Sequence, residues 1–254
     1  MLHTNPTLRF SDRVENYIRY RPGYPPQVLE TLRDKCGLTP DSVIADVACG
    51  TGIFTRLLLE NGNRVFGVEP NREMREAADR LLADHPKFTS LDGTAEATTL
   101  PDHAFDFATA AQAAHWFDLP KARKEFARIL RPRGWAVLIW NERSSDSSPF
   151  LHAYEELLQA YGTDYEQVRH EHTTKNIADF FAPTAFEQRT FPLSQEFNRQ
   201  ELEGRLLSSS YAPTPGHPNY GPMLERLHLI FQTCSKNGRV TMEYTTRMYY
   251  GQLS

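Results

Sequence analysis

Between residues 41 and 141, short apolar segments alternate with helical segments of about ten residues, and this alternation constrains the fold more than any other feature. The apolar segments predict strands at Val43–Val47, Arg64–Val68, Phe88–Leu91, Phe105–Ala110 and Trp135–Trp140. The segments between them predict helices at Phe54–Glu60, Asn71–Ala83 and Leu119–Leu130. Strands joined by helices form right-handed βαβ units with parallel strands, so the sequence predicts a doubly wound α/β sheet.

The segments outside this region predict further elements. Residues 1–40 are expected to form an N-terminal helical cap, with a helix at Gln27–Lys35, and residues 41–254 the main domain. Beyond residue 141, two more strands are expected at Phe186–Phe191 and Val240–Tyr250. Further helices are expected at Phe150–Ala160, Ala178–Phe181, Arg199–Leu207 and Met223–Ser235. Residues 142–185 and 193–236 would then be helical insertions. The predicted fold is a Rossmann-like, doubly wound, seven-stranded, mostly parallel sheet with helices on both faces and a helical substrate lid.

Composition narrows the classes of protein that remain. A length of 254 residues suits one α/β domain with an elaborated lid. The formal net charge of -4 argues against nucleic-acid binding, which usually accompanies a basic balance. We find no signal-peptide pattern and no apolar run near the roughly 20 residues that span a bilayer, so we expect a cytoplasmic protein without a membrane partner. Cys36, Cys49 and Cys234 lack metal-ligand spacing, so no metal site is expected.

The first predicted strand runs directly into a glycine-rich turn, Asp46–Gly52. Glycine lets the backbone turn sharply and leaves no Cβ beneath a ligand, while the following helix presents unpaired N–H groups. Glu69 ends the second predicted strand, about 20 residues after the turn, where an acidic side chain can hold both hydroxyls of a ribose. The two features together predict a nucleoside-binding site. A tight strand-to-helix connection is the alternative interpretation of the turn alone.

Two kinds of nucleotide-type ligand compete for this site. The dinucleotide fingerprint GxGxxG/A has a small third residue, whereas this chain reads Gly50-Thr-Gly52-Ile-Phe-Thr55. About 40 residues also precede the first predicted strand, with which dinucleotide domains often begin. Both observations favour a ligand without a pyrophosphate.

These motifs resemble those of class I S-adenosylmethionine-dependent methyltransferases over residues 10–141. Asp46–Gly52 resembles motif I, and Glu69 matches the acidic residue after the second strand. The other similar segments are Gly93–Glu96 before Leu100–Pro101, Phe105–Asp118, and Leu130–Trp135, in which Arg133 replaces a usual glycine. Segments similar to small-molecule methyltransferases of the methyltransferase-11 and trans-aconitate methyltransferase type are Tyr17–Pro25, Gln112–Asp118 and Tyr244–Gly251.

The resemblance implies that the cofactor is S-adenosyl-L-methionine and assigns residues to each part of it. The methionine end would be shaped by Asp46, Ala48, Gly50, Gly52, Ala110 and Gln112. The ribose and adenine would be held by Glu69, Pro70, Asn71, Ala95 and Glu96. Tyr17 and Arg21 would close over the cofactor, with Arg21 toward its carboxylate; an arginine at a surface turn is the alternative interpretation.

The methyl acceptor implied by the resemblance is a small molecule, which the C-terminal half would recognise. Candidate residues on the substrate side are Trp116, Arg205, Tyr211 and Arg247, although surface salt bridges would also explain the two arginines. His115 is the candidate general base, because its unperturbed pKa lies near neutrality. A histidine that is stacked or hydrogen-bonded in the pocket wall, or one that is merely structural, is the alternative.

Two other functions remain open at this point. A non-catalytic cofactor-binding protein would share the same motifs, and a nicotinamide-dependent oxidoreductase would share the sheet and the glycine-rich turn. The oligomeric state is expected to be a monomer or a homodimer.

Overall fold

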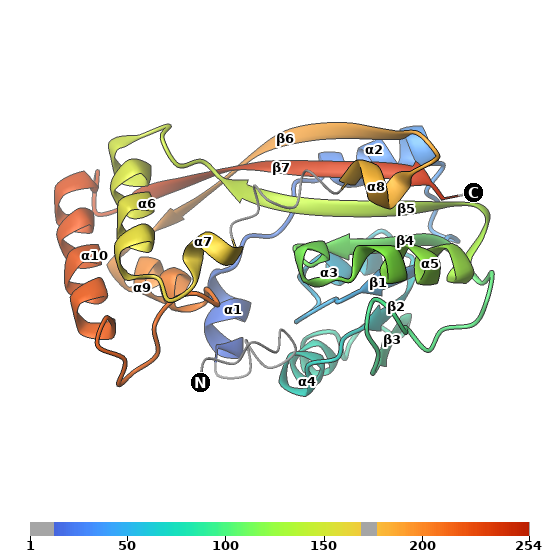
Figure 1. Cartoon of the computed structure of the whole chain (residues 1–254), viewed down its shortest axis with the longest axis horizontal. Coiled ribbons are helices and arrows are strands. Elements are labelled where there is room, and N and C mark those ends of the chain that lie inside the picture. The colour runs from blue at the N-terminus through green and yellow to red at the C-terminus, as the bar shows by residue number, and fades with distance from the viewer. Residues whose placement is uncertain (1–12, 169–176, 254) are drawn as a thin grey trace.

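The structure is a computed structural model that describes residues 13–168 and 177–253, and its centre is a seven-stranded sheet (Figure 1). The strands are β1 (Val43–Val47), β2 (Arg64–Val68), β3 (Phe88–Leu91), β4 (Phe105–Ala111), β5 (Leu130–Arg143), β6 (Phe186–Phe197) and β7 (Val240–Gln252). Their order is β3-β2-β1-β4-β5-β7-β6. The first five strands pair in parallel, whereas β7 is antiparallel to β5 and β6. This confirms the predicted mostly parallel sheet. The order reverses between β1 and β4, where open α/β sheets bind ligands.

Ten α-helices and a short 3-10 helix surround the sheet within the described residues. They are α1 (Val14–Tyr20), α2 (Gln27–Cys36), α3 (Ile53–Glu60), α4 (Arg72–Leu81), α5 (Leu119–Ile129), α6 (Pro149–Tyr161), α7 (Tyr165–Val168), α8 (Ile177–Phe181), α9 (Arg199–Leu207), α10 (Tyr220–Cys234) and η2 (Ala114–Trp116). Several begin at side chains that accept a hydrogen bond from the first turn. Asn71 Oδ1 accepts from the Met74 N–H at 2.9 Å, and Asn198 forms a capping box with Glu201 at α9.

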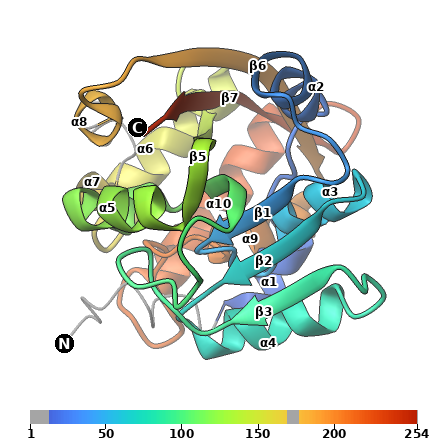
Figure 2. The same cartoon turned by 90° about the vertical axis from the view of Figure 1, so that its right-hand side faces the viewer.

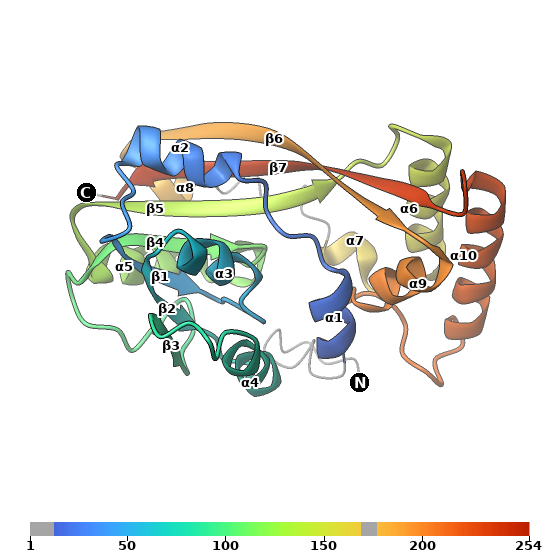
Figure 3. The same ribbon diagram turned by 180° about the vertical axis from the view of Figure 1, so that it is seen from behind.

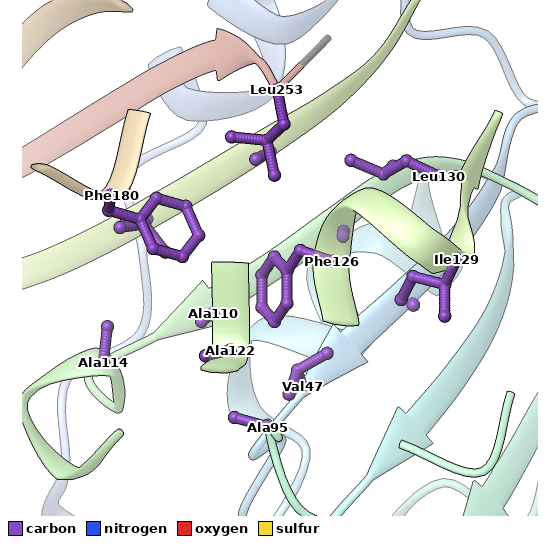
Figure 4. Packing of buried hydrophobic residues seen from close by; sticks show 14 of the residues in the cluster. Val47, Ala95, Ala110, Ala114, Ala122, Phe126, Ile129, Leu130, Phe180 and Leu253 are labelled. Carbon is purple, nitrogen blue, oxygen red and sulfur yellow. The ribbon is translucent and has the colours of Figure 1, made fainter. Parts of the chain in front are cut away.

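The sheet carries helices on both faces, as predicted. Figure 2 shows α5 and α8 on one side and α2 and α3 on the other. Residues along β4 alternate accordingly: Ala108 and Ala110 belong to the cluster under α5 and α8, and Phe107 belongs to the cluster under α2 and α3. Figure 4 shows Phe126 of α5 at the centre of the first cluster. Burial of these faces fixes the register of each strand, because a shift by one residue would expose the apolar set.

Helices α6, α7, α9 and α10 form a second packing unit, the cap, beyond the carboxyl end of the short strands (Figures 1 and 3). Its core joins Tyr154 of α6, Leu202 of α9 and Leu227 of α10 to the first half of β7. The second half of β7, including Met248, belongs to the core under α2 and α3. The expected alternation along β7 is confirmed, since Val240, Met242, Tyr244, Thr246, Met248 and Tyr250 are all buried. The long strands therefore connect the cap to the sheet.

Several predicted boundaries were wrong. β5 begins at Leu130, not Trp135, and continues to Arg143. The expected turn lies inside the strand, where Arg133 adopts a left-handed φ of 67°, which explains why related sequences favour glycine there. β6 continues to Phe197, so the first residues of the expected insertion 193–236 are strand, because β7 offers pairing partners along that whole length. Residues 1–12 of the N-terminal cap and 169–176 of the insertion 142–185 lie outside the described residues.

Candidate functional site

A cavity of about 330 Å³ lies between the carboxyl ends of the parallel strands, helix α1 and the cap. This volume is within the range of small-molecule sites. Most of the predicted site residues line it: Tyr17, Arg21, Asp46, Ala48, Gly50, Glu69, Pro70, Asn71, Ala95, Glu96, Gln112, His115, Trp116, Arg205 and Tyr211. The fold thus brings together residues from both halves of the chain.

The glycine-rich turn forms one end of this cavity. Ala48, Gly50 and Gly52 all have left-handed φ angles, of 56°, 58° and 82°. The turn is tied to β2 by the Cys49 N–H, which donates to the Val68 carbonyl at 3.1 Å. Gln112, at the end of β4, has a φ of 58° as well. Non-glycine residues in this region carry backbone strain and are concentrated at functional sites, which is consistent with a binding role for this edge of the sheet.

Glu69 is held against the turn by two backbone hydrogen bonds. Its Oε2 accepts from the Gly50 N–H and its Oε1 from the Asn71 N–H, both at 2.9 Å. Burial raises the pKa of Glu69, while these two hydrogen bonds and the Arg75 guanidinium oppose the shift. Each carboxylate oxygen can accept a further hydrogen bond, so Glu69 can receive two donors from a ligand.

Asp46 is the second buried carboxylate at this end. It accepts hydrogen bonds from Thr55 Oγ1 at 2.5 Å and from Thr109 Oγ1 at 2.8 Å. Burial raises the pKa of Asp46 to about 6, despite these two hydrogen bonds. A ligand cation placed beside Asp46 would replace the lost solvation and favour the ionised form.

Helix α1 closes the cavity across from the strands. The Arg21 guanidinium lies over the Tyr17 ring, 5.0 Å from its centroid. Arg21 Nη2 donates to the Ser208 carbonyl at 2.9 Å, which ties α1 to the loop after α9. The ring of Tyr20 packs directly on Gly204 of α9: a Cβ atom at residue 204 would lie 2.0 Å from a carbon of that ring. These contacts hold Tyr17 and Arg21 over the site.

His115 lies in η2 and lines the cavity beside Trp116, with ring centroids 4.7 Å apart. Its Nδ1 is 3.5 Å from Trp140 Nε1, which can only donate, so the neutral ring carries its proton on Nε2. In that tautomer, the nitrogen that could accept a proton is already engaged. The geometry favours the alternative in which His115 belongs to the pocket wall.

The other end of the cavity contains side chains that the sequence did not point to. Besides Arg205 and Tyr211, it is lined by Asn141, Arg143, Glu155, Tyr165 and Tyr244. One signal could have identified Arg143, because it comes three residues after a predicted parallel strand, at the edge where ligands bind. The others come from separate elements, and their proximity depends on how the cap packs.

Three predicted site residues do not line the cavity. Gly52 allows the turn to form and Leu82 to pack closely, since a Cβ at residue 52 would lie 2.6 Å from Leu82 Cδ1. Ala110 is fully buried under α5, near Ala122 in Figure 4. Arg247 lies on β7, 36% exposed, and pairs with Glu142, which itself lines the cavity. Successive residues of a strand point to opposite faces of the sheet. Ala110 therefore points away from the cavity, although its neighbour in the sequence lines it.

Two further properties of the described residues bear on function. They contain no group of three or more His, Cys, Asp or Glu side chains arranged to hold a metal ion. No helix among them has both the length and the apolar character needed to cross a membrane.

Comparison with known proteins agrees with this geometry. Residues 45–138, which contain the glycine-rich turn and Glu69, match the model of a methyltransferase domain. An uncharacterised methyltransferase of Mycobacterium bovis is 37% identical over 163 residues, which are 64% of this chain and 63% of that protein. An uncharacterised methyltransferase of Schizosaccharomyces pombe is 32% identical over 59% of each chain. The chain therefore matches less than two thirds of the length of these curated relatives.

Solved structures extend the similarity of the methyltransferase domain to the whole fold. A protein described as a type II methyltransferase of Anaeromyxobacter dehalogenans superposes with a TM-score of 0.67 at 22% identity, covering 92% of this chain and 98% of the other. A methyltransferase from an antibiotic biosynthesis pathway of Anabaena variabilis gives 0.65 at 22% identity, covering 92% and 99%. The fold is methyltransferase-like, and at this identity the likeness concerns the fold alone.

Proposed function

We propose that this protein is an S-adenosylmethionine-dependent methyltransferase that acts on a small-molecule acceptor. One observation carries the proposal: the turn Ala48–Gly50, Asp46 and Glu69 line the same cavity as side chains of the cap. A cofactor at the sheet edge would thus share an enclosed space with an acceptor bound under the cap. The cavity volume of about 330 Å³ supports acceptors of small size.

The ribose and the amino acid part of the cofactor fit the polar groups present. Glu69 is 7% exposed, lines the cavity and has one unused acceptor position on each oxygen, which suits two adjacent hydroxyls. Asp46 suits the cofactor's ammonium group, because burial leaves that carboxylate poorly solvated. Arg21 suits the cofactor's carboxylate, since its Nε is buried without a hydrogen-bond partner in the described chain.

The adenine fits the apolar surface beside Glu69. Pro70, Met74, Ala95 and Phe117 line this part of the cavity. Glu96 also lines it, and its Oε1 accepts from the Asp118 N–H at 2.9 Å, which fixes the loop after β4 against the loop after β3. Flat apolar walls with a few fixed polar groups are typical of sites for heteroaromatic rings.

When bound, the cofactor supplies a methyl group made electrophilic by its sulfonium. The chain's contribution would be to hold the acceptor in line with that methyl group and to exclude water. Trp116 and Phe117 wall the cavity, and Arg21 with Tyr17 covers it, so solvent access would be low. A protein nucleophile is not required, and His115 would form part of the wall that holds the acceptor.

The structure offers an argument against the nicotinamide alternative. In a dinucleotide site the third small residue of the fingerprint allows close packing of helix and strand. Here Thr55 occupies that position, is fully buried and donates to Asp46. Thr55 thus orients the Asp46 carboxylate, whose negative charge would repel a pyrophosphate.

Isothermal titration calorimetry with S-adenosylmethionine, S-adenosylhomocysteine and NADH tests the proposal. We expect micromolar binding of the first two and none of NADH. A second assay with methyl-labelled cofactor and a panel of small acceptors separates an enzyme from a non-catalytic binding protein. Tight NADH binding, or no binding of either sulfur compound, would overturn the proposal.

A further inference from the structure

The end of the cavity farthest from the glycine-rich turn is rich in buried positive charge. Arg143 and Arg205 both line it, and Arg21, which also lines the cavity, is close enough to Arg205 for the two charges to repel each other. Glu155 also lines it and forms an ion pair with Arg143. Glu142 pairs with Arg247 and so contributes no free charge. The guanidinium groups of Arg143 and Arg205, with Arg21 near Arg205, therefore face one carboxylate, Glu155, in this part of the cavity.

Arg205 is the clearest case of an uncompensated charge. It is 5% exposed, and its Nε donates to Tyr244 OH and its Nη1 to Ser209 Oγ, each at 3.2 Å. Both acceptors are neutral oxygens. No carboxylate among the described residues lies within ion-pair distance of Arg205. A charge buried with neutral partners only is costly and is uncommon unless a ligand neutralises it.

Arg143 has donors left over. Its Nη2 donates to Tyr165 OH at 2.9 Å and pairs with Glu155, but its Nε and Nη1 are buried without a hydrogen-bond partner in the described chain. The guanidinium lies over the Tyr154 ring at 4.8 Å, and the Tyr154 hydroxyl is likewise buried without a partner. Buried polar groups are nearly always hydrogen-bonded in proteins, so several unused donors in one place indicate a missing acceptor.

The pKa of Tyr211 indicates a positive electrostatic potential at this end of the cavity. Burial alone would raise the pKa of its phenol, but Arg143, Arg205 and Arg21 outweigh burial and lower it. Ser209 Oγ, which accepts from Arg205, is also 3.5 Å from Arg21 Nη2, so two guanidiniums share one neutral hydroxyl. Repulsion between neighbouring cations of this kind is relieved by an anion bound between them.

We propose that Arg143 and Arg205 form an anion subsite, with Tyr211 beside them, that binds an anionic group of the methyl acceptor. The group is a carboxylate or a phosphate, because both can accept two parallel hydrogen bonds from a guanidinium. This proposal rests on the proposed function, in which Arg21 is taken by the cofactor's carboxylate. With Arg143 paired to Glu155, the remaining charge of Arg205 matches one negative charge on the acceptor.

Thermal unfolding in the presence of small anions tests the subsite without requiring activity. Wild-type protein is titrated with succinate, with glycerol 3-phosphate and with neutral succinamide, at constant ionic strength set by sodium chloride. We expect saturable stabilisation by the succinate or the phosphate ester and none by succinamide. The anion with the lower half-saturation concentration identifies the class. Equal shifts with all three compounds, or no saturable shift, would overturn the subsite.

Variants locate the effect on the named arginines. Arg205→Met should raise the half-saturation concentration at least tenfold. Arg205→Lys keeps the charge and the fold but loses the forked geometry, and should show a smaller rise. The matched control is Arg189→Met, an exposed arginine of β6 that pairs with Glu187, which should leave the titration unchanged. An unchanged titration in both Arg205 variants would overturn the assignment, whatever the stability of the Met variant.

The same variants separate this proposal from the one on which it rests. S-adenosylhomocysteine affinity, measured by calorimetry, should stay within twofold of wild type in Arg205→Met, because Asp46 and Glu69 are unchanged. If wild-type protein binds no S-adenosylhomocysteine, the proposed function fails, while anion stabilisation still reports on the subsite. If cofactor product binds but no anion stabilises the protein, the subsite alone fails.

Discussion

The two ends of the cavity are built in different ways. The glycine-rich end uses backbone N–H groups and two carboxylates: Asp46, on β1, and Glu69, which directly follows the adjacent strand β2. The cap end uses guanidinium and phenol side chains such as Arg143, Arg205 and Tyr211, which come from a strand, a helix and a loop. The glycine-rich end is built by a local motif, which suits a ligand that many proteins bind. The cap end is built by side chains that only long-range packing brings together.

The two ends also carry opposite charge. Burial disfavours the ionised form of Asp46 and Glu69 at one end, while guanidiniums collect at the other. The cofactor's ammonium and sulfonium would suit the acidic end, and an anionic acceptor would suit the basic end. The charges at each end therefore destabilise the unliganded fold, and a ligand of opposite charge is expected to stabilise it. The two ends can thus be compared by measuring stability with and without each ligand.

The largest effect is expected at Asp46. Burial raises the pKa of Asp46 in the folded protein to about 6, above its ordinary value of 3.8, so ionised Asp46 destabilises the fold above pH 6 and this cost disappears as pH falls below 4. Asp46→Asn should raise the free energy of unfolding at pH 7 by up to about 3 kcal/mol and weaken S-adenosylhomocysteine binding. Urea denaturation at pH 7 and pH 4.5, with calorimetry, measures both, and the gain should fall to about a third at the lower pH. Lower stability at pH 7 would contradict this view of the acidic end.

A smaller effect on ligand binding is expected at Glu69. Glu69→Gln keeps the size of the side chain but removes the charge on the group that would accept hydrogen bonds from the ribose hydroxyls. Because hydrogen bonds to a charged group contribute roughly 1.5–3 kcal/mol, S-adenosylhomocysteine affinity should fall about 10- to 100-fold. Glu187→Gln, on β6 and 57% exposed, is the matched control. Equal affinity in the two variants would remove Glu69 from the site.

The connection between the two ends can be loosened at Gly204. In Gly204→Ala the new methyl group would collide with the Tyr20 ring of α1, so we expect a loss of about 2 kcal/mol in stability and a fall in Tm of several degrees. Gly221→Ala, in α10, meets no atom within 4 Å and should be neutral or slightly stabilising. Differential scanning calorimetry distinguishes the two. An unchanged Tm in Gly204→Ala, or a fall of equal size in both variants, would contradict a tight contact between α1 and α9.

The smallest effect is expected at the start of α9, the helix that carries Arg205. Asn198 caps this helix through a hydrogen bond from the Glu201 N–H at 3.0 Å, and Asn198→Ala should cost about 1 kcal/mol of stability. Because this substitution changes contacts only within the packing unit of α6, α7, α9 and α10, S-adenosylhomocysteine affinity should not change. A parallel loss of cofactor affinity would mean that the two ends are coupled through α9.

The sheet, the succession of its elements along the chain and most of the acidic end could be predicted from the amino-acid sequence. Five-residue apolar strands and the turn at Asp46–Gly52 are local patterns, since strand period, turn chemistry and helix caps depend on neighbours in the chain. The ends of β5 and β6 could not be predicted, because strand length depends on the partner strand and so is set in the folded chain. The tertiary structure also removed Ala110 and Arg247 from the cavity and added Arg143, because which face a side chain shares with a distant element is fixed by packing between residues that the sequence leaves far apart.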